Sequence, residues 1–190
     1  MPKGEGFTLI ELMVAVAVLA VVLTAGVPSF RDIVRNNRLS SMANEFSATL
    51  NYARSEAIKR GIRVSVRKSG TNWENGWQVF TDNSGTAGTN DGTDVTLRVH
   101  GALSQNYILR GNNNFANFIS FMANGTSNNM GTFALCDVSS GSNTPVRGTS
   151  RVLIVNAVGR VRMGIDSNSN GIPETNDGTT VTDLSDCTSP

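Results

Sequence analysis

A run of about 21 predominantly apolar residues near the start of the chain, residues 7–27, constrains this sequence more than any other feature. Glu11 is the one charged residue that interrupts it. An α-helix rises 1.5 Å per residue, so the run would be ~30 Å long, which is the thickness of the hydrocarbon core of a bilayer. A globular domain of this size has no use for an apolar helix of that length. The run therefore predicts a membrane-spanning helix or a signal sequence.

A second helical pattern follows directly. Pro28 would ordinarily end or kink a helix, yet from Ile33 to Ile58 apolar residues recur at steps of three and four, with charged residues on the other side. This is the pattern of an amphipathic helix. Gly61, preceded by two basic residues, predicts the end of the helix. We expect one helix from Phe7 to about residue 60, with its first half in lipid and its second half buried against the rest of the chain.

Beyond Gly61 the chain consists of short apolar runs separated by Gly, Asn, Ser and Thr. These runs predict strands, and two stretches rich in Gly, Asn, Ser and Thr, residues 83–92 and 137–148, predict loops. An antiparallel sheet with one apolar face would cover the helix stripe, which predicts a single α+β unit. The expected strands are residues 62–68, 77–81, 94–100, 118–122, 132–136, 151–156 and 160–163, and the last two would form a hairpin.

Composition leaves little material for catalysis. The chain has two cysteines, Cys136 and Cys187, and a single histidine, and it contains no C-x-x-C or H-E-x-x-H motif. A secreted enzyme would need a catalytic constellation that is not visible here, so we expect no enzymatic activity. If this part of the chain is exported, the cysteines form a structural disulfide, and the alternative is two free thiols. Net charge is +1, but residues 164–190 carry five acids and no base.

Residues 3–11, KGEGFTLIE, resemble the type III signal sequence of type IV pilins and type II secretion pseudopilins. The resemblance implies that a prepilin peptidase cuts after Gly6, that Phe7 becomes the N-methylated first residue, and that Glu11 serves in assembly. It also implies the division of the chain into a leader (residues 1–6), a transmembrane half of the helix (residues 7–28), an amphipathic half (residues 29–60) and a β-rich head (residues 61–190).

Four further segments resemble the GspH/FimT/FimU branch of minor pilins and minor pseudopilins: residues 50–57 (LNYARSEA), 121–125 (FMANG), 152–155 (VLIV) and 159–162 (GRVR). This resemblance implies the type IV pilin fold, a long N-terminal helix packed on an antiparallel head, with Cys136 bonded to Cys187 to hold the C-terminal tail. It implies other pilins or pseudopilins and the prepilin peptidase as partners. It also implies a single-pass inner-membrane protein with a periplasmic head, which joins a type IV pilus or a type II secretion pseudopilus, at its tip.

Glu11 has two interpretations. A carboxylate in a spanning helix is costly and is functional by default, so the resemblance favours a pair with the Phe7 amine of a neighbouring subunit. The alternative is that Glu11, close to the helix end, reaches the membrane surface. The charges beyond the span are harder to place: Arg31 and Arg35 follow it, whereas Lys3 precedes it and is offset by Glu5. By the positive-inside rule alone, these charges favour the opposite orientation.

Arg160 and Arg162 are the candidate binding residues of the head. They are two apart in an expected strand, so their side chains share one face and both can reach phosphates. The G-R-x-R element resembles that of FimT-type pilins, which implies binding of double-stranded DNA without sequence preference, for DNA uptake in natural transformation. The alternative is an ordinary solvated strand, and the acidic tail argues against DNA.

One segment of the tail has the spacing of a calcium loop. Asp166, Asn168, Asn170 and Asp177 stand at the first, third, fifth and twelfth places, with Gly171 at the sixth. Two asparagines in place of aspartates lower the charge of the loop, and Asp replaces the usual final Glu. The alternative is a polar turn. Apart from this calcium site we expect no cofactor.

Overall fold

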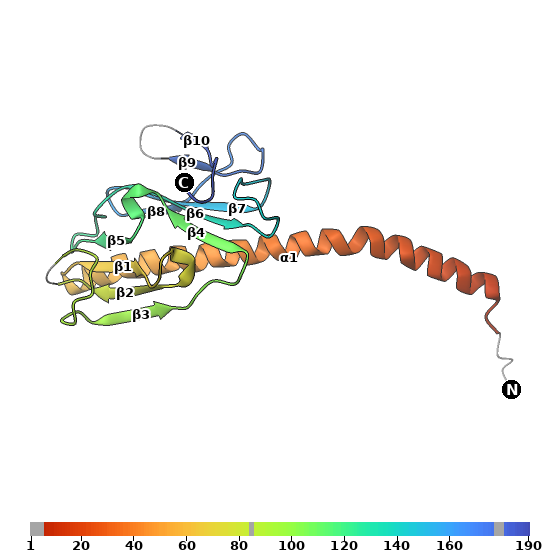
Figure 1. The fold of residues 1–190 in the computed structure, drawn as a ribbon, viewed down its shortest axis with the longest axis horizontal. Helices are drawn as coiled ribbons and strands as arrows, with labels where there is room; N and C mark the ends of the chain where they lie inside the picture. Colours follow the sequence, from red (N-terminus) through yellow and green to blue (C-terminus); the bar gives the residue numbers. More distant parts are fainter. Residues whose placement is uncertain (1–5, 84–85, 177–180) are drawn as a thin grey trace. The chain divides into compact units, whose positions relative to one another are not determined.

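The computed structural model describes residues 6–83, 86–176 and 181–190 (Figure 1). The chain divides into two compact units, residues 1–37 and residues 38–190. Helix α1, Leu9–Arg60, begins in the first unit and ends in the second. The expectation of one long helix is therefore confirmed, and the helix passes Pro28 without interruption. Among the described residues, none of the helices combines the length and the hydropathy that a membrane crossing requires.

The first unit contains no strand in its described residues, and the described side chains of residues 9–37 are exposed. The second half of α1 is different, because it carries a buried stripe. The members of this stripe recur at three- and four-residue steps, and each is at most 1% exposed: Leu39, Ala43, Phe46, Leu50, Ala53 and Ala57. The helix ends as expected, with Gly61 in the left-handed region (φ 68°) and its N–H donating to the Ala57 carbonyl at 3.0 Å.

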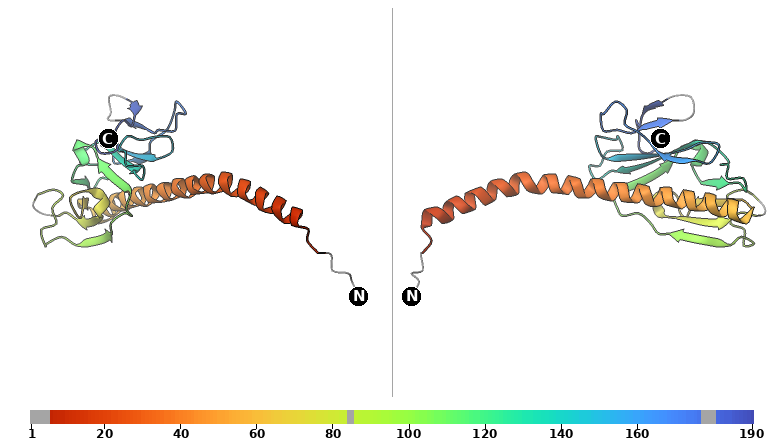
Figure 2. Two further views of the ribbon diagram at one scale, coloured as in Figure 1. Left: turned by 45° about the vertical axis from the view of Figure 1, so that its right-hand side comes forward. Right: turned by 180° about the vertical axis from the view of Figure 1, so that it is seen from behind.

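Two four-stranded antiparallel sheets pack against this stripe. The first has the order β3-β2-β1-β5 and the second the order β4-β6-β7-β8. Their strands are β1 (Val64–Lys68), β2 (Trp77–Thr81), β3 (Thr96–His100), β5 (Phe118–Phe121), and β4 (Tyr107–Gly111), β6 (Gly131–Asp137), β7 (Ser150–Val155), β8 (Val161–Met163). Seen from behind, one side of the helix remains uncovered by strands (Figure 2).

All seven expected strands are present, but the expectation of a single sheet is wrong. A single sheet needs only one apolar face, whereas β7 buries residues on both faces, with Leu153 toward the helix and Val152 toward the tail. Strand β4 and the hairpin of β9 (Glu174–Asn176) and β10 (Val181–Asp183) were not expected from the sequence. The two strands of that hairpin are three residues long and largely polar, so they carry no periodic apolar signal.

An aromatic cluster joins the helix to both sheets. The ring of Phe46 lies edge-on to Trp77 of the first sheet and to Phe133 of the second, with ring centroids 4.9 Å apart in each case. Trp73, in the short 3-10 helix η1 (Trp73–Asn75), contacts both Phe46 and Phe133 and donates its indole N–H to the Phe115 carbonyl at 2.9 Å. Both tryptophans are therefore core residues.

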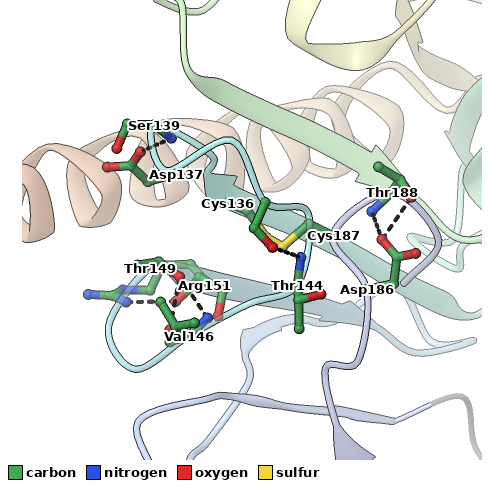
Figure 3. Close-up of a disulfide and its surroundings, with 12 residues drawn as sticks. Cys136, Asp137, Ser139, Thr144, Val146, Thr149, Arg151, Asp186, Cys187 and Thr188 are labelled. Carbon is green, nitrogen blue, oxygen red and sulfur yellow. Dashed lines mark hydrogen bonds between the residues drawn. A yellow bond between two sulfur atoms is a disulfide. The ribbon is translucent and has the colours of Figure 1, made fainter.

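The C-terminal tail covers the outer face of the second sheet. A second apolar cluster forms there from Val152 and Ile154 of β7, and from Leu184 of the tail. The disulfide between Cys136 of β6 and Cys187 lies in the same cluster (Figure 3), with Cα atoms 6.1 Å apart. The pairing that the resemblance implies is thus present. The Asp186 carboxylate next to it accepts hydrogen bonds from the N–H and Oγ of Thr188, which lower its pKa.

The disulfide yields the first prediction. It closes a loop with a sequence separation of 51 residues, so Cys187→Ser should lower the free energy of unfolding of the head by about 2–5 kcal/mol. Urea unfolding of residues 31–190 measures this loss. Cys136→Ser and the double variant should each lose about the same amount, because all three remove one bond. Losses that add up in the double variant would contradict this account.

Candidate functional site

The expected cleavage site lies on an exposed segment in front of α1. Phe7 is 81% exposed, and no atom of the described residues lies within 4 Å of the position that a Cβ on Gly6 would occupy. A larger residue at Gly6 would therefore meet no steric obstacle in the folded chain. The described part of the fold therefore gives no reason for a glycine at this position.

Glu11 has a partner within its own chain. Its Oε2 accepts hydrogen bonds from the backbone N–H of Thr8 at 3.3 Å and from Thr8 Oγ1 at 3.2 Å. The Glu11 N–H in turn donates to Thr8 Oγ1 at 3.3 Å. This reciprocal arrangement is a capping box, in which two residues satisfy the free N–H groups at the start of a helix. This capping box was not among the expectations from the sequence, although T-x-x-E before an apolar run is its signature.

Arg54 joins α1 to two turns of the head. Its Nε donates to the Gly125 carbonyl at 2.9 Å, and its Nη2 donates to the Val158 carbonyl at 3.0 Å. Gly125 lies in the turn after β5, and Val158 lies in the turn between β7 and β8. A third hydrogen bond, from the Ser127 N–H to the Ala157 carbonyl at 3.1 Å, connects the two turns directly. Arg54 and Gly125 thus belong to two of the segments that carry the family resemblance, and Val158 directly precedes a third, residues 159–162.

We call the contact of Arg54 with these two turns the Arg54 joint, and it requires a glycine at position 159. Its φ of 75° is left-handed, and an added Cβ would overlap the Gly125 carbonyl oxygen and lie 3.1 Å from Arg54 Nε. The glycine of the G-R-x-R element therefore has a structural reason that is independent of any ligand. Periodicity did not reveal it, because the contact joins residues far apart in the sequence.

Arg160 directly precedes β8, and Arg162 lies within it. Arg160 and Arg162 are exposed, whereas Val161 between them packs against the core. Neither guanidinium has an ion-pair partner among the described residues. Arg151 lies on the other side of the sheet, where its Nε and Nη2 donate to Ser40 Oγ of α1 at 3.2 and 3.0 Å, and burial lowers its pKa.

The acidic tail lies beside Arg162. A cavity of about 170 Å³ is lined by Arg162 and Ile154 on the sheet and by Glu174 and Val181 on the tail. The Glu174 carboxylate accepts hydrogen bonds from Ser167 Oγ and from the Ser167 N–H, which lower its pKa. Glu174 is therefore anionic at neutral pH, and it reduces the positive potential at Arg162.

The structure brings three of the four calcium candidates together. The Asp166 carboxylate accepts from the N–H groups of Asn170 and Gly171, at 3.0 and 2.7 Å. Asn168 and Asn170 donate to the carboxylate of Asp183 in β10, which the sequence analysis had not considered. Asp177 lies outside the described residues. Within the described ranges, no group of three or more His, Cys, Asp or Glu side chains is placed to hold a metal ion.

Two models of known protein families match parts of this chain. Residues 42–159 match the family model of the type II transport protein GspH, and residues 1–27 match the prokaryotic N-terminal methylation motif. The prepilin peptidase-dependent protein D of Escherichia coli (strain K12) is 39% identical over 46 residues, which is 24% of this chain. The match spans about a third (32%) of that protein's length.

Two solved structures share the fold. Both are crystal structures of the type IV minor pilin FimU of Pseudomonas aeruginosa PAO1, in space groups P21 and P65. The first has a TM-score of 0.57 and 24% identity, covering 80% of this chain and 96% of that one. The second has a TM-score of 0.55 and 23% identity, covering 78% and 98%. The type IV pilin fold expected from the sequence is thus confirmed.

The joint at Arg54 predicts the effect of a single methyl group. Gly159→Ala should lower the free energy of unfolding of the head by about 2–4 kcal/mol, because it adds a steric overlap to the strain of a left-handed alanine. Gly141 is a matched control, since it has a φ of 79° but open space around its Cβ position. Gly141→Ala should cost only the strain, about 1–2 kcal/mol. Equal losses in urea unfolding would show that Gly159 has no steric role.

Proposed function

Because the chain belongs to the GspH family of type II transport proteins, we propose that it is a minor pilin or minor pseudopilin that a prepilin peptidase processes and that then assembles into a filament. The processed chain begins at Phe7, residues 7–28 insert into the inner membrane, and the head lies in the periplasm. Its partners are the prepilin peptidase and other pilins or pseudopilins, and its place is at the tip of a type IV pilus or a type II secretion pseudopilus.

The observation that carries this proposal is the arrangement along one helix. The N-terminal methylation motif covers residues 1–27, and α1 begins two residues after Phe7 and supplies the buried stripe of the GspH-type head. A conventional signal peptide is removed from the protein that it exports. Here the apolar segment belongs to the same helix as the core of the head, and cleavage after Gly6 would keep that helix intact.

The geometry of Glu11 supports an assembly role. Both hydrogen bonds from Thr8 go to Oε2, so Oε1 has no partner among the described residues. A carboxylate oxygen accepts further hydrogen bonds. We propose that Oε1 accepts the amine of Phe7 of a neighbouring subunit, while the capping box holds the carboxylate in place.

The mature N-terminus tests the proposal. Intact mass of the protein extracted from membranes should correspond to a chain that starts at N-methylated Phe7. Replacing Gly6 with a bulky residue should leave the precursor uncut and unassembled, because the peptidase would no longer recognise the site. The described structure gives no reason for that variant to misfold, so a loss of cutting would not reflect unfolding. A mature start near Ala25 or Val27 would indicate ordinary signal peptidase and would contradict the proposal.

A second candidate function is binding of double-stranded DNA. The observation that favours it is the exposure of Arg160 and Arg162 on one face without ion-pair partners in the described residues. Such a face contacts phosphates, so binding would be independent of sequence and strongly dependent on salt. Glu174 beside Arg162 keeps this binding weak. In this role the protein would act in DNA uptake during natural transformation.

DNA binding predicts a clear loss on charge reversal. Residues 31–190 should bind duplex DNA, and Arg160→Glu/Arg162→Glu should weaken binding and flatten its salt dependence by about two contacts. Arg98→Glu is the control for the effect of one charge reversal. It should bind DNA nearly as well as the parent, because the guanidinium of Arg98 packs over the Tyr52 ring and lies outside the proposed contact face. Each titration should be run with calcium and with a chelator, since calcium at Asp166, Asn168, Asn170 and Asp177 would offset the acidic tail. Undiminished binding by the double variant under both conditions would leave the filament role alone.

A further inference from the structure

The first unit ends in an amphipathic segment whose apolar side chains are not covered. Phe30, Ile33 and Val34 are 68%, 57% and 48% exposed. They stand at positions i, i+3 and i+4 of α1, so they share one face of the helix. Apolar residues with this spacing in a helix ordinarily bury against something. The aromatic and aliphatic side chains of this face are therefore available to a partner outside the chain.

Two arginines stand beside this apolar face. Arg31 follows Phe30 by one position and Arg35 follows Val34 by one position, and the four-residue step places both guanidinium groups on one side of the helix. Both are exposed, and neither has an ion-pair partner among the described residues. Asp32 is the one acid in residues 12–44, so the segment is basic on balance.

We propose that Arg31 and Arg35 bind the phosphates of anionic lipid headgroups at the outer surface of the inner membrane, while Phe30, Ile33 and Val34 enter the boundary between headgroups and acyl chains. This inference rests on the proposed function, because it takes residues 7–28 as the span. The segment begins two residues after that span, which is the depth at which headgroups lie. Basic residues with an adjacent apolar face are the chemistry of an interfacial helix.

The proposal accounts for the charges that the positive-inside rule leaves unexplained. That rule concerns the side on which basic residues remain during insertion. Once the arginines are outside, anionic headgroups attract them there as well. The alternative occupant of the same face is the helix of a neighbouring subunit. Such a helix would cover Phe30, Ile33 and Val34 but would supply no phosphate to the arginines.

Lipid selectivity of the full mature chain tests the proposal. The protein in a nonionic detergent is mixed with equal amounts of phosphatidylglycerol and phosphatidylcholine, and the bound lipids are counted by native mass spectrometry. Each arginine should contribute about a fivefold preference for phosphatidylglycerol, weakened by salt and partly offset by Asp32. Arg31→Gln/Arg35→Gln should remove most of this preference, while its circular dichroism stays unchanged because glutamine favours helices.

Lys59→Gln/Arg98→Gln is the matched control, because it removes the same charge from residues that belong to no proposed binding site, and it should retain the preference. An unchanged preference in Arg31→Gln/Arg35→Gln would overturn the inference. If that variant also formed no filaments in cells, the face would meet a neighbouring subunit and not lipid. Failure of the proposed function is a separate outcome: alkaline carbonate would then release the mature chain from membranes.

Discussion

The burial of one stripe of α1 between two sheets is the interaction on which the rest of the head depends. Phe46 contacts aromatic rings from both sheets, and the neighbouring stripe residues are alanine or leucine. Small residues let the strands approach the helix closely, and the large rings fill the space between the sheets. Without the stripe, neither four-stranded sheet could bury its inner face. The helix therefore forms the core of the head and also supplies most of the described residues of the first unit.

This dual role of the helix gives the polar joint at Arg54 its importance. Apolar packing is non-directional, so it sets how strongly the helix is held but not the positions of the turns around it. The guanidinium fixes those positions through two directed hydrogen bonds, and Gly159 permits the close approach that these bonds need. Segments that the sequence marks as typical of the family thus act here as one structural contact. In a filament, such a contact would keep the head in register on its own helix.

Local patterns in the sequence predicted the features that depend on neighbouring residues. The end of α1 at Gly61 follows from such patterns, and so does the alternation of the exposed Arg160 and Arg162 with Val161, which packs against the core. Contacts between distant residues could not be predicted in this way. Arg54 meets Gly125 and Val158, which are 71 and 104 residues further along the chain. The division into two sheets depends equally on how the tail covers β7. No local pattern in the sequence predicts that packing.

The residues of the candidate site also divide into those that the sequence predicts and those that depend on contacts between distant parts of the chain. Resemblance to the family identified Gly6, Phe7 and Glu11, and the methylation motif match covers all three positions. The capping role of Glu11 was readable from T-x-x-E. The position of Glu174 beside Arg162 was not, because the tail folds back onto the sheet through the Cys136–Cys187 bridge. That fold-back decides how much positive potential the arginines present.

Hydrogen exchange in Arg54→Met tests the central claim, that one arginine on the helix holds both turns, most directly. Hydrogen bonds from a charged donor contribute about 1.5–3 kcal/mol each. The N–H groups of Gly125, Ser127 and Gly159 should therefore exchange at least about tenfold faster in the variant, while the central amides of β6 and β7 keep their protection. Arg98→Met, which removes another arginine packed on α1, should leave these three N–H groups unchanged. If only one turn responds, or if neither does, the two turns are held by other contacts and the account of the joint is wrong.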